Sequence, residues 1–132
     1  MKDSRAPVLL VDDRRENLVA LEAVLAPLGC RLVTATSGAE ALKSLLDHEF
    51  AVILLDVQMP ELDGFETADY IKRRERTRSI PIIFVTAISK EQHHVFRGYE
   101  AGAVDYVFKP YDPVVLRSKV AVFIELWRAG RA

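Results

Sequence analysis

Residues 8–13 read VLLVDD, four apolar side chains followed at once by two acids. Residues 51–56 repeat the pattern as AVILLD, and an acid again closes the apolar run. A strand that is apolar on both faces is typical of a parallel sheet covered by helices on each side. The two runs therefore predict buried strands of an α/β protein, each with aspartate at its carboxyl end.

Outward from these runs, the chain alternates short apolar stretches with longer amphipathic ones. The expected strands are residues 8–11, 31–36, 51–55, 81–85 and 104–108. The expected helices are about 18–28, 37–47, 65–76, 89–102 and 112–127. Helix starts are marked by Ser37 with Glu40, by Ser89 with Gln92, and by Asp112 before a proline. We expect a flavodoxin-like, doubly wound (βα)5 fold with a five-stranded parallel sheet of order 2-1-3-4-5, an order taken from known folds of this kind.

Composition sets limits on the kind of protein. The 132 residues are 50% hydrophobic, and we expect one domain over residues 1–132 with its core in about 7–128. A formal net charge of −1 argues against direct binding of nucleic acid, which normally needs a positive surplus. The basic run at residues 72–76 is interpreted as cations that complement a helix dipole rather than as a nucleic-acid patch.

Two further features concern the compartment. The sequence has no apolar run near the ~20 residues of a membrane span, and its first six residues are polar. Cys30 is the only cysteine, so an internal disulfide is excluded, and we expect it to be a buried small hydrophobe. These features favour a cytoplasmic protein without a membrane partner.

Charged and polar side chains stand at the carboxyl ends of four expected strands. In a sheet of this order the first and third strands are neighbours, which brings Asp12, Asp13 and Asp56 into one cleft. Carboxylates this close repel one another, at about 4 kcal/mol for two unit charges ~4 Å apart near a protein surface. Protonation or a hard divalent cation would offset this repulsion, and oxygen ligands with room for water suit Mg²⁺.

The remaining strand ends add a hydroxyl and a cation. Thr86 closes the fourth strand and could hydrogen-bond a phosphoryl oxygen, and Lys109 follows the fifth strand. A carboxylate nucleophile, a metal ion and a lysine are the components that phosphoryl transfer to an aspartate needs. The pattern predicts that Asp56 accepts a phosphoryl group.

At this point the chain resembles the receiver domains of bacterial two-component response regulators, over about residues 7–127. The shared motifs are VDD at 11–13, LDVQMP at 55–60, DG at 63–64, TA at 86–87 and KP at 109–110. The resemblance implies that Asp56 is phosphorylated by a sensor histidine kinase or a phosphotransfer protein. It also implies Mg²⁺ bound by Asp13, Asp56 and the backbone carbonyl of Gln58, with Asp12 acting mainly through metal-bound water.

The resemblance further implies a switch. Thr86 would move towards the phosphoryl group, for which the small side chain of Ala87 leaves room, and Tyr106 would turn inward behind it. That movement would alter the surface made by the fourth helix, fifth strand and fifth helix. A Tyr106 that is simply an edge-strand aromatic is the alternative. A cis peptide bond before Pro110 is also implied, and would aim Lys109 into the cleft.

The last helix carries two apolar stripes. The expected core stripe is Leu116, Val120, Phe123 and Trp127. Val115, Val122 and Leu126 form a second stripe about 100° around the helix, which would mediate a homodimer or dock an attached output domain, or would simply be covered by loops. Asn17-Leu18 is similar to receivers attached to kinases or other enzymatic outputs. A receiver excised from the N-terminus of a longer protein is therefore favoured over a stand-alone one.

Two other functions remain possible at this stage. Phosphohydrolases with an Asp nucleophile generally need a second Asp two residues further on, where this chain has Gln58. A receiver-like interaction module that works without phosphorylation usually lacks an acid, the Thr or the Lys, and all are present here. We therefore expect no enzyme with an external substrate, only self-phosphorylation and slow loss of the phosphoryl group.

Overall fold

A computed structural model describes residues 4–87 and 103–131, and its centre is a parallel sheet. The strands are β1 (Pro7–Val11), β2 (Arg31–Ala35), β3 (Val52–Leu55), β4 (Ile82–Thr86) and β5 (Ala103–Phe108). They lie in the order β2-β1-β3-β4-β5, and every neighbouring pair is parallel. The predicted flavodoxin-like fold class and strand order are confirmed.

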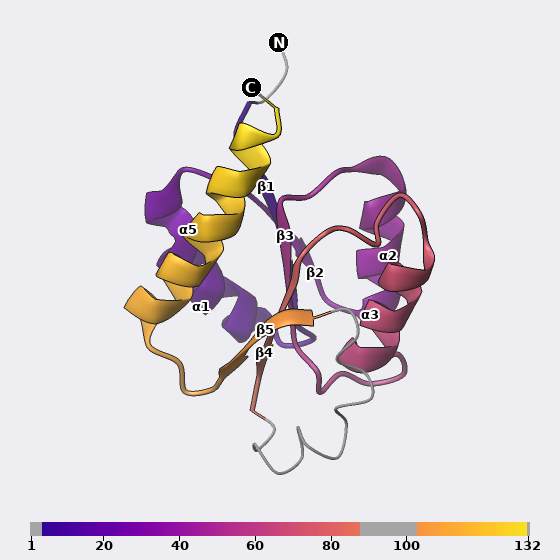
Figure 1. Ribbon diagram of the computed structural model, residues 1–132. Coiled ribbons are helices and arrows are strands. Elements are labelled where there is room, and N and C mark those ends of the chain that lie inside the picture. Colours follow the sequence, from indigo (N-terminus) through magenta and orange to yellow (C-terminus); the bar gives the residue numbers. More distant parts are fainter. Residues whose placement is uncertain (1–3, 88–102, 132) are drawn as a thin grey trace.

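Helices cover both faces of the sheet (Figure 1). They are α1 (Arg15–Leu25), α2 (Gly38–Asp47), α3 (Gly64–Arg73) and α5 (Pro113–Ala129), and a short 3₁₀ helix (Ala26–Leu28) extends α1. α1 and α5 lie on one face, and α2 and α3 lie on the other. The helix expected at about 89–102, with its Ser89 start, lies outside the described residues.

The doubly apolar strands follow from this layering. Alternate residues of β1 point to opposite faces, so that Val8 and Leu10 pack with α1 and α5, whereas Leu9 and Val11 pack with α2 and α3. β3 and β4 divide their side chains between the two faces in the same way. The strands must therefore be apolar at every position, which is the pattern that predicted a covered sheet.

Helix ends show where local chemistry departs from the expected pattern. Ser37 accepts a hydrogen bond from the Glu40 amide as predicted, but the Glu40 carboxylate binds Thr36 instead of completing a capping box. A complete capping box occurs at Asp63 and Glu66, where α3 begins. α3 ends at Arg73, not at about residue 76, because Arg74 has extended backbone angles of φ −90° and ψ 130°.

One lysine of the basic run at residues 72–76 also holds a loop in place. Lys72 lies in the last turn of α3, and its Nζ donates to the carbonyls of Arg78 and Ile80, 2.8 Å from each oxygen. Burial lowers the pKa of this ammonium group. The side chain thus fastens the loop between α3 and β4, in addition to placing positive charge at the helix end.

α5 buries one stripe and exposes another. Its buried residues are Leu116, Val120 and Ile124, while Phe123 and Trp127 are only partly buried beside them. The predicted core stripe was therefore wrong in omitting Ile124. The second stripe is exposed, at 48% for Val115, 55% for Val122 and 62% for Leu126.

Two further observations concern the length of the helices and the single cysteine. Among the described residues, no helix combines the length and apolar character needed to cross a membrane. Cys30 is buried as expected, and burial raises the pKa of its thiol.

Gly64 allows the β3–α3 loop to fold back onto the end of β3. Its amide donates to the Val57 carbonyl, with 2.9 Å between nitrogen and oxygen. A Cβ at this position would lie 2.2 Å from the Asp56 carbonyl oxygen and 2.6 Å from the Val57 Cα. Backbone atoms cannot give way as a flexible side chain can, so only glycine fits here.

Replacement of Gly64 by alanine should therefore displace the loop that follows Asp56. We expect Gly64→Ala to lower the free energy of unfolding by about 1–3 kcal/mol, the usual cost of overpacking. Gly130→Ala is the matched control, because its Cβ would meet nothing closer than 3.7 Å. Urea denaturation of both variants measures the difference, and equal stability would contradict the close approach.

Candidate functional site

Three carboxylates meet at the carboxyl edge of the sheet. Asp12 and Asp13 follow β1, and Asp56 follows β3, whose pairing with β1 continues through a hydrogen bond from the Asp56 amide to the Val11 carbonyl (3.0 Å). One oxygen from each carboxylate lies within 4.8 Å of the others. Asp12 and Asp56 are buried, at 1% and 6% exposure, whereas Asp13 is exposed. The cluster thus has two fixed acids and one open side.

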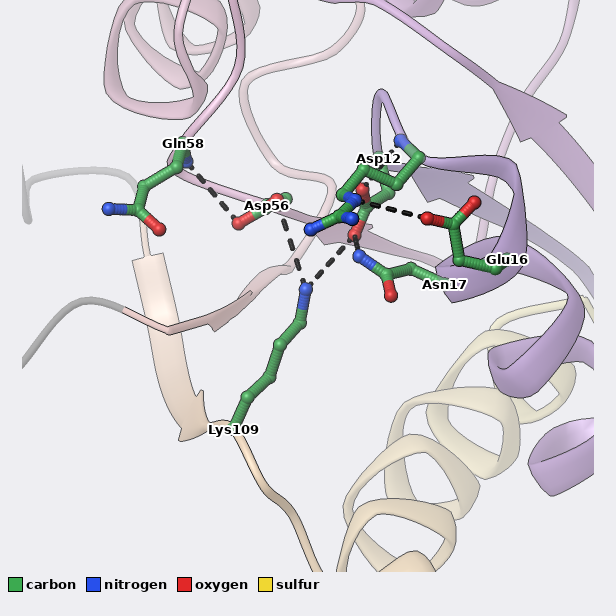
Figure 2. A network of polar contacts seen from close by, with 7 residues as sticks. Asp12, Glu16, Asn17, Asp56, Gln58 and Lys109 are labelled. Carbon is green, nitrogen blue, oxygen red and sulfur yellow. Dashed lines mark hydrogen bonds and ion pairs between the residues drawn. The ribbon is translucent and has the colours of Figure 1, made fainter.

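Lys109 enters this cluster from the end of β5. Its Nζ lies 3.1 Å from Asp12 Oδ2 and 3.8 Å from Asp56 Oδ2, between the two buried acids (Figure 2). Its amide donates to the Thr86 carbonyl, which fixes the start of the side chain beside β4. The Lys109–Pro110 peptide bond is cis, as the resemblance implied. One ammonium group is shared by two carboxylates.

Asp12 is held by donors on all sides. Its Oδ1 accepts from the Arg14 amide at 2.9 Å, and its Oδ2 accepts from Asn17 Nδ2 and Lys109 Nζ, each at 3.1 Å. The sequence singled out Asn17 only for its likeness to particular receivers and missed this contact. The signal was a polar side chain five residues after the acid, on the first turn of α1.

The loop after β3 frames Asp56. The Gln58 amide donates to Asp56 Oδ1, with 3.3 Å between the two atoms. Glu61 has a φ of 65°, in the left-handed region that non-glycine residues seldom adopt, and the chain then returns to the close approach at Gly64. The Gln58 backbone therefore contacts Asp56 through its amide, and the use of its carbonyl as a metal ligand stays a prediction.

Thr86 and Tyr106 lie on β4 and β5, the two strands beyond β3 in the sheet. Thr86 is buried at the end of β4, and its side chain hydrogen-bonds Asp56. Ala87 is exposed directly after it. The Tyr106 ring packs between Phe84 and Phe108, at centroid distances of 5.2 and 6.3 Å, and its hydroxyl oxygen is buried. The ring therefore lies inward, against the core shared with α2 and α3.

The electrostatics of Asp56 reflect this crowding. Burial raises its pKa above the ordinary value of 3.8, and the nearby Asp12 charge raises it further. Lys109 and the hydrogen bonds from Gln58 and Thr86 oppose the shift but do not cancel it. Asp56 is thus an ionisable group whose charge is costly in the folded protein unless a further cation joins the site.

The residues present fit a hard divalent cation. The candidate ligands named here are oxygens, two of the three carboxylates share the Lys109 ammonium group, and the exposed Asp13 side leaves room for water. Such a donor set favours Mg²⁺ or Ca²⁺ over softer metals, and Mg²⁺ usually keeps several waters beside one or two carboxylates. Of the site residues predicted from the sequence, the structure brings together Asp12, Asp13, Asp56 and Lys109, with the Gln58 amide on Asp56. Tyr106 packs between Phe84 and Phe108 instead.

Fold and site together define an α/β domain with an acidic, lysine-containing centre at the ends of its parallel strands. Residues 8–121 match the model of the response regulator receiver domain. The chain therefore belongs to the response regulator receiver domain family.

Relatives and solved structures agree with this assignment. The chain is 38% identical over 122 residues to a probable cyclic di-GMP phosphodiesterase of Vibrio cholerae. The aligned region covers 92% of this chain and 27% of that protein. It is 35% identical over 117 residues to the transcriptional regulatory protein GltR of Pseudomonas aeruginosa, covering 89% and 48% respectively. The chain thus spans less than half the length of these relatives.

Among solved structures, the signal receiver domain of a histidine kinase from Syntrophus aciditrophicus superposes with a TM-score of 0.82 at 32% identity, covering 91% of this chain and 90% of that one. The chemotaxis response regulator CheY4 of Vibrio cholerae superposes with a TM-score of 0.80 at 29% identity, covering 91% and 99%.

Asp56→Asn should stabilise the metal-free protein at neutral pH. Because the folded-state pKa of Asp56 is raised, the folded protein holds its proton more readily than the unfolded chain, and stability falls as pH rises through that pKa. We expect the variant's advantage to be largest at neutral pH and to vanish below pH 3.8, the ordinary value. Chemical denaturation across this range measures it.

The control for that experiment is Asp69→Asn, which changes an exposed acid paired with Arg73. A surface pair of this kind contributes at most about 1 kcal/mol, without the same pH profile. Saturating Mg²⁺ should raise the stability of the wild type more than that of Asp56→Asn. An Asp56→Asn variant less stable than the wild type at pH 7 would contradict the account.

Proposed function

We propose that this chain is a phosphoacceptor domain that receives a phosphoryl group on Asp56 from a phosphohistidine of a sensor histidine kinase or phosphotransfer protein. A carboxylate oxygen of Asp56 attacks phosphorus, the bond from phosphorus to the histidine nitrogen breaks, and an acyl phosphate forms. The observation that carries the proposal is the convergence of three acids and Lys109 on one point of a receiver fold.

Mg²⁺ would be held by Asp12, Asp13, Asp56 and the backbone carbonyl of Gln58, with Asp12 acting mainly through water. When bound it supplies positive charge that offsets the carboxylates and the transferring phosphoryl oxygens. The raised pKa of Asp56 supports this role, because a cation beside the carboxylate would favour its ionised form, which is the nucleophile.

The chain's own residues would orient and stabilise the phosphoryl group. Lys109 already lies within 4 Å of Asp56 and provides an ammonium group for a phosphoryl oxygen. Thr86 hydrogen-bonds Asp56 in the present state and would transfer that bond to the new group. The small side chain of Ala87, the residue after Thr86, would leave room for the phosphoryl group.

The signal would then pass to the surface through Tyr106. Its ring shares contacts with Phe84, two residues before Thr86 on the same strand. A movement of Thr86 towards a phosphoryl group would stabilise the inward ring position and change the surface around β5 and α5. The response is a shift between two pre-existing states, driven by about two units of added charge.

The response to phosphorylation would be carried out by an attached output domain or by a partner protein. The family's longer relatives include a transcriptional regulator and a probable phosphodiesterase, so an attached output domain is one possibility and a homodimer is another. The exposed α5 stripe of Val115, Val122 and Leu126 supports either contact. We place the protein in the cytoplasm, with no enzymatic activity on an external substrate and no direct nucleic-acid contact.

Acetyl phosphate with Mg²⁺ tests the proposal without a partner kinase. We expect intact-mass spectrometry to detect one added phosphoryl group on the wild type and none on Asp56→Asn. Absence of the adduct from both proteins would contradict the proposal. Rapid turnover of many phosphoesters would instead favour a phosphohydrolase, for which Gln58 stands where an acid is generally needed.

The α5 stripe has a separate test. If it mediates a homodimer, beryllofluoride should raise the sedimentation mass towards that of two chains. Leu126→Ser, at a side chain 62% exposed, should then weaken association by about tenfold or more without unfolding the domain. A monomer at high concentration, with and without beryllofluoride, would rule out this use of the stripe.

A further inference from the structure

Asn17 is a polar residue of α1 that the phosphoacceptor chemistry does not use directly. Its Nδ2 donates to Asp12 Oδ2 at 3.1 Å, the same oxygen that accepts from Lys109 Nζ at 3.1 Å (Figure 2). The other oxygen of Asp12 accepts from the Arg14 amide. Two side-chain donors, one neutral and one charged, therefore share one oxygen of a carboxylate that is 1% exposed.

The second donor on Asp12 matters because the Lys109 ammonium group pairs with two carboxylates, those of Asp12 and Asp56. In the present state its Nζ is nearer to Asp12 Oδ2, at 3.1 Å, than to Asp56 Oδ2, at 3.8 Å. A phosphoryl group on Asp56 would offer the ammonium new, strongly accepting oxygens on the far side. If Lys109 turns to those oxygens, Asp12 Oδ2 loses its charged donor.

A buried carboxylate oxygen that loses its hydrogen-bond donor destabilises the protein, because it has given up its bonds to water and no longer has a partner in their place. The hydrogen bond from Asn17 would leave Asp12 Oδ2 with one donor after Lys109 has moved away. It stands on α1, which is packed into the core through Leu18 and Leu21, so its position does not depend on Lys109. The Arg14 amide donates to Oδ1, so within the part of the chain that the structure describes Asn17 is the donor that stays on Oδ2 when Lys109 leaves.

We propose that Asn17 is a positioning residue that keeps the Asp12 carboxylate hydrogen-bonded and in place while Lys109 moves from Asp12 to the phosphoryl group. The inference rests on the proposed phosphoacceptor function and deepens it. Loss of Asn17 weakens the phosphorylated state more than the resting state, because Asp12 Oδ2 keeps the Lys109 ammonium only in the resting state.

The test is a pair of titrations followed by amide chemical shifts of the folded domain. Mg²⁺ is added first, and beryllofluoride is then added at saturating Mg²⁺ as a stand-in for the phosphoryl group. For Asn17→Ala we expect the Kd for beryllofluoride to rise about tenfold, the effect of losing one hydrogen bond to a charged group. The Kd for Mg²⁺ should change by less than about threefold, since Lys109 still holds Asp12 in that state.

Two comparisons protect the interpretation. Asn17→Ala should not unfold the domain, because alanine is the better helix former and the residue lies in the first turn of α1. Glu16→Gln is the matched control. Its side chain is 67% exposed and pairs with the Arg14 guanidinium, whereas Asp12 accepts from the Arg14 backbone amide, so this change should leave both Kd values unchanged.

The outcomes separate this inference from the function on which it rests. A wild type that binds both ligands, with Asn17→Ala equal to it within twofold, would overturn the role of Asn17 and leave the proposed function standing. Equal weakening of Mg²⁺ and beryllofluoride by Asn17→Ala would also overturn it, because that result means general damage to the site. A wild type that binds neither ligand would overturn the proposed function and, with it, the inference.

Discussion

The repulsion among the carboxylates of Asp12, Asp13 and Asp56 is the constraint on which the rest of the site depends. Parallel β1 and β3 are neighbours, so their carboxyl ends deliver these acids to one place within 4.8 Å. Burial makes the negative charge of Asp56 more costly still and raises its pKa. One ammonium group, from Lys109, stands against three acids. This excess of negative charge is the basis of our proposal that the site binds a cation and responds when a phosphoryl group changes its charge.

The surrounding structure holds this unfavourable arrangement in place. Two buried clusters, one on each face of the sheet, fix the strands and hence the positions of their ends. Gly64 brings the following loop against the Asp56 backbone, and Asn17 and Arg14 hold Asp12 from the α1 side. Packing of the apolar core, away from the acids, supplies the free energy that offsets the repulsion among the closely spaced carboxylates. Separation of stability from chemistry is common in doubly wound folds, where ligands bind beyond the strand ends.

Much of this was predictable from the sequence because buried strands and their terminal acids are local patterns. VLLVDD and AVILLD identify both the core strands and the site, and the fold then brings distant residues such as Lys109 to them. Other features depend on tertiary contact and leave a weak local signal. The end of α3 at Arg73 was missed because the polar residues after it continue a helical pattern. Ile124 and Asn17 were missed because their roles depend on which neighbours α5 and α1 meet.

The central claim is that one carboxylate among the crowded acids, Asp56, is the nucleophile. Borohydride reduction after treatment with acetyl phosphate and Mg²⁺ tests this most directly, because it converts an aspartyl phosphate into homoserine that peptide mass spectrometry can locate. The account predicts homoserine at position 56 alone. Homoserine at position 12 or 13, or at no aspartate, would contradict it.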